Sequence, residues 1–158
     1  MIPLGAYTLR AADNSDRQDI WNLIQVILSS YGLTMDAKTI DNDLTDIDEH
    51  YWKRRGFFFV LVDGNKVIGT VALHYKSDAV CELGRMYLDA AYRGQGLGRG
   101  LLEHALATAQ ALGFTDIFLK TRSELTEAIR LYTRAGFVAS PVKEMDGNCD
   151  LVMYKNIT

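Results

Sequence analysis

Three glycines and two arginines stand together in the segment Arg93-Gly94-Gln95-Gly96-Leu97-Gly98-Arg99. Glycine has no side chain to keep an anion away from the backbone, so several N–H groups can point into one concavity. A helix-like run starts at Leu97, and the N-terminus of a helix favours negative charge. The segment therefore predicts a binding site for a pyrophosphate group.

Two other phosphate-binding loops have different spacings. A dinucleotide fingerprint has G-x-G-x-x-G, and a mononucleotide P-loop has G-x-x-x-x-G-K-[ST]. Residues 93–98 instead give R-x-x-G-x-G. Neither of those nucleotide sites is therefore expected.

The elements that must position this loop follow from hydrophobic spacing and turn residues. Asp63-Gly64-Asn65-Lys66 predicts a tight hairpin, and Gly136 is the expected C′ residue of the last helix. The expected elements are strand 6–10, helix 14–32, helix 36–49, strands 57–62 and 67–73, strand 81–88, helix 97–112, strand 115–120, helix 124–135, and strands 137–138 and 149–154.

This order, β-α-α-β-β-β-α-β-α-β-β, predicts an α/β fold with a twisted, mixed central sheet and helices on both faces. Within it, the acid-rich segment 36–49 has apolar residues at Ile40, Leu44 and Ile47, spaced by four and three. That spacing predicts a helix lying across the surface.

Length and composition predict a single domain over residues 1–158. The chain is 48% hydrophobic and 23% charged, and its net charge is −3. This balance gives no basic footprint for nucleic acid or an anionic membrane. No apolar run approaches the roughly 20 residues that span a bilayer, and residues 1–5 lack the pattern of a signal peptide. We expect a soluble, cytoplasmic protein that binds neither nucleic acid nor a membrane.

The two cysteines, Cys81 and Cys149, have neither metal-ligand spacing nor a disulfide framework. Both are expected to be buried thiols, and no metal is expected.

The Gly-rich segment stands in a wider pattern. Glu82-Leu83-Gly84-Arg85-Met86-Tyr87-Leu88 precedes it, and Ala128-Ile129-Arg130-Leu131-Tyr132-Thr133-Arg134-Ala135-Gly136-Phe137 follows it. In this combination the chain resembles the GCN5-related N-acetyltransferase (GNAT) superfamily, specifically over residues 81–138. The resemblance implies the GNAT fold and acetyl-CoA as co-substrate.

The resemblance also implies how acetyl-CoA is held. The R-x-x-G-x-G loop binds the pyrophosphate through backbone N–H groups, and the end of the preceding strand splays at a bulge and pairs its backbone with the pantetheine arm. The implied cofactor-binding residues are Met86, Tyr87, Leu88, Arg93, Gly94, Gln95, Gly96, Leu97, Gly98 and Arg99.

Tyr132 resembles the tyrosine that protonates the departing coenzyme A thiolate in many members. A phenol with a pKa near ~10 is protonated at neutral pH and can donate to a thiolate. A tyrosine on an amphipathic helix can also be a core residue with its hydroxyl at the edge.

Glu82 is the expected general base. Period-two alternation puts it on the same strand face as Met86, four residues later, and a carboxylate there could deprotonate an amine directly or through water. The alternative is a salt-bridged structural glutamate. His74, on the preceding strand, is a second candidate base or a packing residue.

Acceptor selection in this superfamily comes mainly from the first two helices and a late loop. Here these correspond to Tyr31, the acid-rich segment 36–49, Tyr51, Trp52 and residues 145–148. Acidic residues at the mouth would favour a cationic amine, and a solvated helix face is the alternative. The acceptor itself is not identified.

The expected function is transfer of the acetyl group of acetyl-CoA to a primary amine of a small molecule or peptide by direct attack. One alternative is a binding module that senses acyl-CoA without turnover. Another is an acyltransferase that uses a longer acyl-CoA. Exposed strand edges often pair in this fold, which makes a homodimer the expected assembly.

Overall fold

The computed structural model describes residues 1–146 and 149–158, and the side chains of residues 1–140 and 149–158. One eight-stranded sheet has the order β1-β2-β3-β4-β5-β6-β8-β7. All neighbouring strands are antiparallel except β5 and β6. The strands are β1 (Ile2–Leu4), β2 (Tyr7–Ala11), β3 (Phe57–Asp63), β4 (Lys66–Tyr75), β5 (Val80–Leu88), β6 (Asp116–Thr121), β7 (Val138–Asp146) and β8 (Cys149–Asn156).

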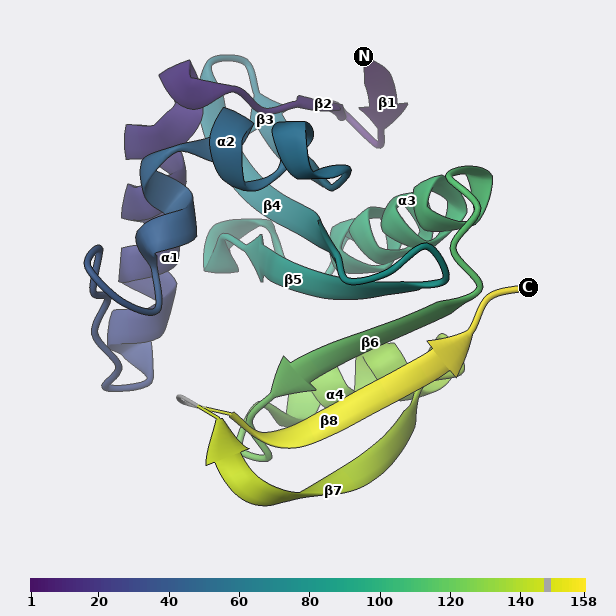
Figure 1. Ribbon diagram of the computed structural model, residues 1–158. Coiled ribbons are helices and arrows are strands. Elements are labelled where there is room, and N and C mark those ends of the chain that lie inside the picture. The colour runs from purple at the N-terminus through teal and green to yellow at the C-terminus, as the bar shows by residue number, and fades with distance from the viewer. Residues whose placement is uncertain (147–148) are drawn as a thin grey trace.

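Helices cover both faces of the sheet, as expected. They are α1 (Arg17–Ser30), α2 (Ile47–His50), α3 (Leu97–Ala111) and α4 (Thr126–Arg134). Helices α3 and α4 pack on one face, which we call the α3 face, and α1 and α2 pack on the other, the α1 face. Figure 1 shows α4 behind β6 and β8, with α1 and α2 grouped beside the strands of the N-terminal half.

The predicted order of elements is confirmed, with one addition. β1 pairs with β2 and was not expected from the sequence. The hairpin between β3 and β4 has Gly64 at its predicted place, with φ at 59°. At the end of α4, Gly136 N–H donates to Thr133 O, and Phe137 N–H donates to Tyr132 O, both at 3.0 Å. These two bonds form a Schellman motif and confirm Gly136 as the C′ residue.

The acid-rich segment is the element that the sequence predicted wrongly. Residues 36–49 form turns, a 3₁₀ turn at Asn42–Thr45 and the one-turn helix α2 in place of one surface helix. The Asn14 side-chain oxygen accepts the N–H of Ile47 at 2.7 Å, and the Asp46 carboxylate accepts that of Glu49 at 3.1 Å. Such side-chain bonds compete with a continuous helix.

Within residues 1–146 and 149–158, no helix combines the length and the apolar character that crossing a membrane requires.

Candidate functional site

The Gly-rich loop, residues 93–98, connects β5 to α3 through a 3₁₀ turn at Ala90–Tyr92. Gly94 and Gly96 have φ angles of 81° and 77°, a left-handed conformation that is costly for residues with a Cβ. An added Cβ would meet no atom within 4 Å at either glycine. The two glycines therefore shape the backbone and leave open space around it.

The main-chain N–H groups of residues 94–99 are available to a ligand. The first hydrogen bond that closes a turn of α3 runs from Gly100 N–H to Gly96 O at 3.1 Å. Among the described residues, no protein acceptor receives the six N–H groups before it. Arg93 is exposed beside them, whereas Arg99 pairs with Glu103, Nε to Oε1 at 2.8 Å. The loop thus has the donors that an anion site at a helix N-terminus needs.

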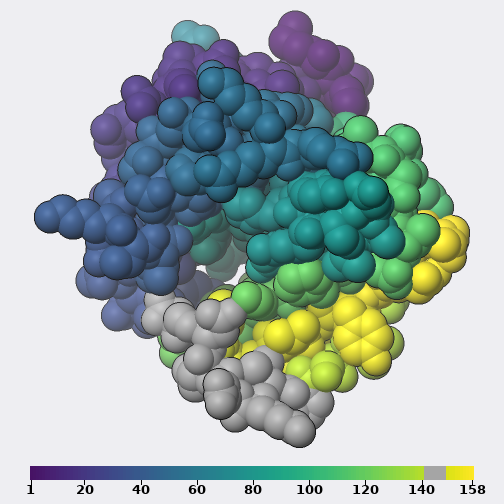
Figure 2. Space-filling view, in the orientation of Figure 1, coloured from purple at the N-terminus to yellow at the C-terminus, as the bar shows by residue number. Residues whose placement is uncertain are grey.

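The two parallel strands separate just before this loop. β5 and β6 pair from Val80↔Asp116 to Leu83↔Leu119, and residues 84–88 of β5 have no partner on β6. Figure 1 shows the strands diverging, and Figure 2 shows a hollow at this place. We call this space the β5–β6 opening. Along it, β5 has backbone groups that a continuous sheet would have paired.

A β-bulge lies at the start of the unpaired stretch. The register of β4 and β5 shifts between Thr70↔Tyr87 and Ala72↔Gly84, so β5 has one extra residue there. Arg85, inside this interval, has a φ of 49°, and its carbonyl oxygen accepts the Thr70 hydroxyl at 2.6 Å. The bulge that the resemblance implied is present.

The bulge overturns one expectation. Glu82 and Met86 do not share a face of β5, because the extra residue reverses the alternation of side chains. Met86 packs against the core on the α3 face, whereas Glu82 pairs with His74 of β4 on the α1 face.

Four side chains that the sequence did not bring together hold the bulge from the α1 face. Arg85 donates from Nη1 to Asp41 Oδ1 at 2.9 Å, and from Nε and Nη2 to the two Asp43 oxygens at 3.1 and 2.6 Å. The Tyr51 hydroxyl also donates to Asp43. We call Arg85, Asp41, Asp43 and Tyr51 the anchor cluster. Its two aspartates bind Arg85 and are not open to a cationic amine.

Arg85 is the one positive charge in the anchor cluster, and it pairs with both aspartates. Burial opposes ionisation of Asp43, but the Arg85 guanidinium outweighs it, and the pKa of Asp43 is lowered. Burial, followed by the negative charge of Asp43, raises the pKa of the Tyr51 hydroxyl well above its ordinary value. Asp43 is therefore ionised at neutral pH, and Tyr51 is a neutral phenol.

Removing the Arg85 guanidinium should destabilise the protein. Arg85→Met leaves Asp41 and Asp43 buried without their partner, and we expect the free energy of unfolding to fall by about 3 kcal/mol at pH 7. The lowered pKa of Asp43 means that its stabilisation is present above about pH 4 and is lost as the pH falls through the folded-state pKa. Urea unfolding at pH 7 and pH 3 should therefore show a smaller difference between the two proteins in acid.

A triple variant supplies the control. Adding Asp41→Asn and Asp43→Asn to Arg85→Met removes the uncompensated charges, and most of the lost stability should return. Equal destabilisation of the single and triple variants would show that packing, and not charge, is what Arg85 contributes.

Tyr132 lies on α4 and is buried on the α3 face, with its ring 5.9 Å from that of Phe137. Burial, and then the neighbouring Tyr87, raise the pKa of its hydroxyl. No group in the described part of the chain hydrogen-bonds to that hydroxyl. Tyr132 is thus a protonated phenol near the stretch of β5 that lines the opening.

Glu82 and His74 are direct cross-strand partners on the α1 face. Lys76 Nζ lies 3.1 Å from Glu82 Oε1. Glu82 therefore has the salt bridge that a purely structural glutamate would have. The His74 ring packs on the Tyr51 ring at 4.3 Å. Burial lowers the pKa of His74 despite the nearby carboxylates of Asp43 and Glu82, so the imidazole is neutral at pH 7.

The expected acid and base therefore lie on opposite faces of the sheet, Tyr132 on the α3 face and Glu82 on the α1 face. A thioester in the opening would meet an amine from the α1 face and a proton donor from the α3 face. This division is one that acyl transfer can use, because the amine gives up a proton to one group and the thiolate receives a proton from another.

The residues expected to select the acceptor are dispersed. Tyr31 is exposed at the C-terminal end of α1, and Tyr51 is part of the anchor cluster. The Trp52 indole donates to Ala12 O at 2.8 Å and packs against β3. The side chains of residues 145–148 lie outside the described part of the structure.

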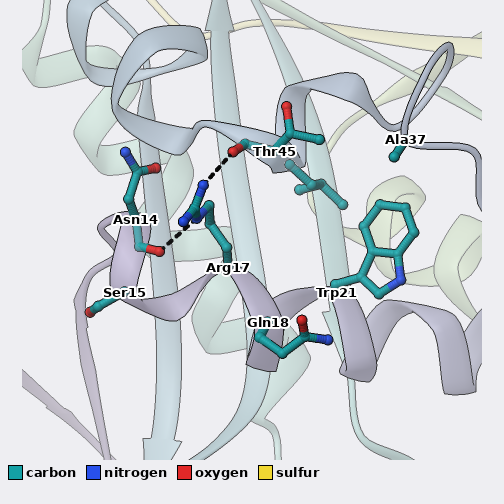
Figure 3. A pocket seen from close by; sticks show the side chains of 8 residues that line it. Asn14, Ser15, Arg17, Gln18, Trp21, Ala37 and Thr45 are labelled. Carbon is teal, nitrogen blue, oxygen red and sulfur yellow. Dashed lines mark hydrogen bonds between the residues drawn. The ribbon is translucent and has the colours of Figure 1, made fainter.

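A shallow pocket of about 510 Å³ lies between α1 and the acid-rich segment. Figure 3 shows Arg17 crossing it to donate to Asn14 O at 2.9 Å and Thr45 O at 2.8 Å. Its lining is Asn14, Ser15, Arg17, Gln18, Trp21, Ala37, Leu44 and Thr45. It includes neither the Gly-rich loop nor the residues of the β5–β6 opening.

The cysteines only partly follow expectation. Cys81 is buried, which raises its pKa to about 12, whereas Cys149 is half-buried. In residues 1–146 and 149–158, no group of His, Cys, Asp or Glu has the arrangement of a metal site.

Comparisons with known proteins, by sequence and by structure, point to one family. The model of the Acetyltransferase (GNAT) family matches residues 24–137. The uncharacterized N-acetyltransferase YjgM of Escherichia coli is 31% identical over 82% of this chain and 80% of its own length. A GNAT-family acetyltransferase of Staphylococcus aureus superposes with a TM-score of 0.90 at 20% identity, over 97% of this chain and all of the other.

One solved neighbour shows a ligand. The structure of yncA from Salmonella typhimurium, determined with its cofactor acetyl-CoA, matches with a TM-score of 0.76 at 22% identity, over 98% of this chain and 95% of that one. The structural neighbours share the fold, and the family model together with YjgM assigns the chain. It belongs to the GNAT family of N-acetyltransferases.

Proposed function

We propose that residues 1–158 act as one domain that transfers the acetyl group of acetyl-CoA to a primary amine. The observation that carries this proposal is the junction of the Gly-rich loop with the unpaired stretch of β5. A free row of N–H donors and a free strand edge meet there within one continuous segment. Acetyl-CoA has a pyrophosphate that the N–H donors can bind and a pantetheine arm whose amides can pair with the free strand edge.

Individual residues have defined roles in this proposal. The N–H groups of residues 94–98 bind the pyrophosphate, with Arg93 and Arg99 beside them. The backbone of Met86, Tyr87 and Leu88 pairs with the pantetheine arm, and N–H groups there stabilise negative charge on the carbonyl oxygen. The structure of yncA with its cofactor acetyl-CoA, which shares the fold, supports the choice of acetyl-CoA as co-substrate.

Proton transfer is divided between two side chains. Glu82 receives the proton of the attacking amine on the α1 face, and Tyr132 donates one to the thiolate from the α3 face. Burial raises the pKa of Tyr132, which keeps the phenol protonated through the neutral range and also makes it a weaker acid toward the thiolate than an exposed tyrosine. His74 is neutral, so in this proposal Glu82 and not His74 receives the proton of the amine.

The first experiment is calorimetry with acetyl-CoA, followed by measurement of thiol release with a panel of amines. Binding followed by thiol release supports the proposal. Binding without release for any amine would identify a sensing module, and tighter binding of longer acyl-CoA would identify another donor. No binding of coenzyme A in any acylation state would refute the proposed function.

The role of Glu82 is separable from its ion pair. Glu82→Gln should lower kcat/KM by about 100-fold, because a general base contributes on this scale, and should leave acetyl-CoA affinity unchanged. Steady-state kinetics measures the first quantity and calorimetry the second.

Two variants control this test. Lys76→Met removes the ion pair but keeps the carboxylate, and should retain activity. If it loses as much as Glu82→Gln, then Glu82 is structural. If kcat/KM fell in His74→Gln but not in Glu82→Gln, the His74 imidazole would be the general base.

A further inference from the structure

One row of side chains crosses the sheet beside the β5–β6 opening. The registers give His74↔Glu82, Glu82↔Phe118 and Phe118↔Tyr154, from β4 through β5 and β6 to β8. Partners in adjacent strands have their side chains on the same face, about 5 Å apart. We call His74, Glu82, Phe118 and Tyr154 the acceptor row.

The acceptor row lies on the α1 face, and the helices of that face do not cover its β6–β8 end. The neighbours Ile117, Leu119 and Met153 are buried in the core on the α3 face, which fixes Phe118 and Tyr154 on the opposite side. The core beneath α1 and α2 contains no described residue of β6, β7 or β8. Tyr154 is 51% exposed and Phe118 is half-buried. In Figure 1 no helix lies in front of β6 and β8.

The row is continuous with the proposed reaction site. Glu82 and Phe118 form the next-to-last pair before β5 and β6 separate at Leu83↔Leu119. Gly84 follows Glu82 on the same face, and a Cβ there would meet nothing within 4 Å. There is thus room on this face at the point where the strands open.

The chemistry of the row changes along its length. One end has the Glu82 carboxylate, which pairs with the solvent-accessible Lys76 at 3.1 Å, and an ammonium group of the acceptor would take the place of that partner. The other end has two aromatic rings that offer apolar surface, and aromatic side chains bury large areas when they are covered. A ligand matched to both ends has an amine joined to an apolar or aromatic body.

We propose that the acceptor is a primary amine with an aromatic or apolar body, which lies over Phe118 and Tyr154 while its nitrogen lies at Glu82. This inference rests on the proposed function and adds the class of acceptor to it. The anchor cluster is consistent with it, because Asp41 and Asp43 bind Arg85 and do not form a polycation site.

The test compares 2-phenylethylamine, 1,4-diaminobutane and aspartate as acceptors at saturating acetyl-CoA. The value of kcat/KM for 2-phenylethylamine should exceed the other two by about tenfold or more. Tyr154→Ser should raise KM for 2-phenylethylamine several-fold and leave 1,4-diaminobutane unchanged. Leu112→Ser is the control, since Leu112 is 56% exposed but lies at the end of α3, on the other face of the sheet.

Calorimetry of 2-phenylethylamine on the protein saturated with coenzyme A gives a second readout that does not need turnover. Binding that Tyr154→Ser weakens and Leu112→Ser does not weaken supports the inference. Equal or better use of 1,4-diaminobutane or aspartate would overturn it, as would no binding of 2-phenylethylamine to the coenzyme A complex. Absence of acetyl-CoA binding is a separate result, which refutes the proposed function itself.

Discussion

Gly96→Asp is expected to lower the affinity for acetyl-CoA by about 100-fold, or roughly 2.7 kcal/mol. Gly96 stands at the start of α3 with a φ of 77°, so an aspartate there would strain the backbone and put a negative charge beside the N–H groups proposed for the pyrophosphate. The carboxylate would repel the pyrophosphate. Calorimetry with acetyl-CoA measures the loss.

Two variants separate this effect from backbone strain. Gly113, at the other end of α3, has a φ of 94°, and a Cβ added there would meet no atom within 4 Å. Gly113→Asp should destabilise the protein comparably and leave acetyl-CoA affinity intact. Gly96→Asn, which has the shape without the charge, should lose less affinity than Gly96→Asp. If Gly96→Asp bound acetyl-CoA as tightly as the parent, the pyrophosphate could not lie at the Gly-rich loop.

Tyr132→Phe is expected to lower kcat by about 100-fold, the contribution of one positioned general acid. The phenyl ring keeps the packing against Phe137, so stability and acetyl-CoA affinity should stay close to those of the parent. Because the pKa of Tyr132 is raised, its hydroxyl stays protonated through the neutral range, and kcat of the parent should not fall with the loss of this proton up to about pH 9.

Rate measurements from about pH 6 to about pH 9 on both proteins test this assignment. Tyr87→Phe is the control, because Tyr87 is proposed to act through its backbone alone. A kcat that is unchanged in Tyr132→Phe would dismiss the phenol as the acid and leave it a core residue.

Local signals in the sequence were sufficient for most of the fold. The hairpin at Gly64, the helix end at Gly136 and the loop at Gly94 and Gly96 were all predicted, and each has the positive φ that favours glycine. These features depend on a few neighbouring residues. The periodic apolar positions of α3 are likewise a local property, and its buried face confirms them.

Features that depend on distant residues were missed. Arg85 meets Asp41 and Asp43 across 44 and 42 positions of sequence, and no spacing rule connects them. Because those aspartates turn inward, the segment that contains them could not form the predicted helix. The face of Met86 was mispredicted for a similar reason, since a bulge changes the alternation without a distinct residue pattern.

A recognition site built from main-chain atoms restricts the sequence in an unusual way. In the proposed mode of acetyl-CoA binding, what matters at the Gly-rich loop and along the free edge of β5 is the path of the polypeptide, and most side chains there can be exchanged as long as that path is kept. Selection would then act on backbone shape more than on chemical identity. Proteins that share only 20% of their residues with this chain and still superpose with a TM-score of 0.90 are what such a rule allows.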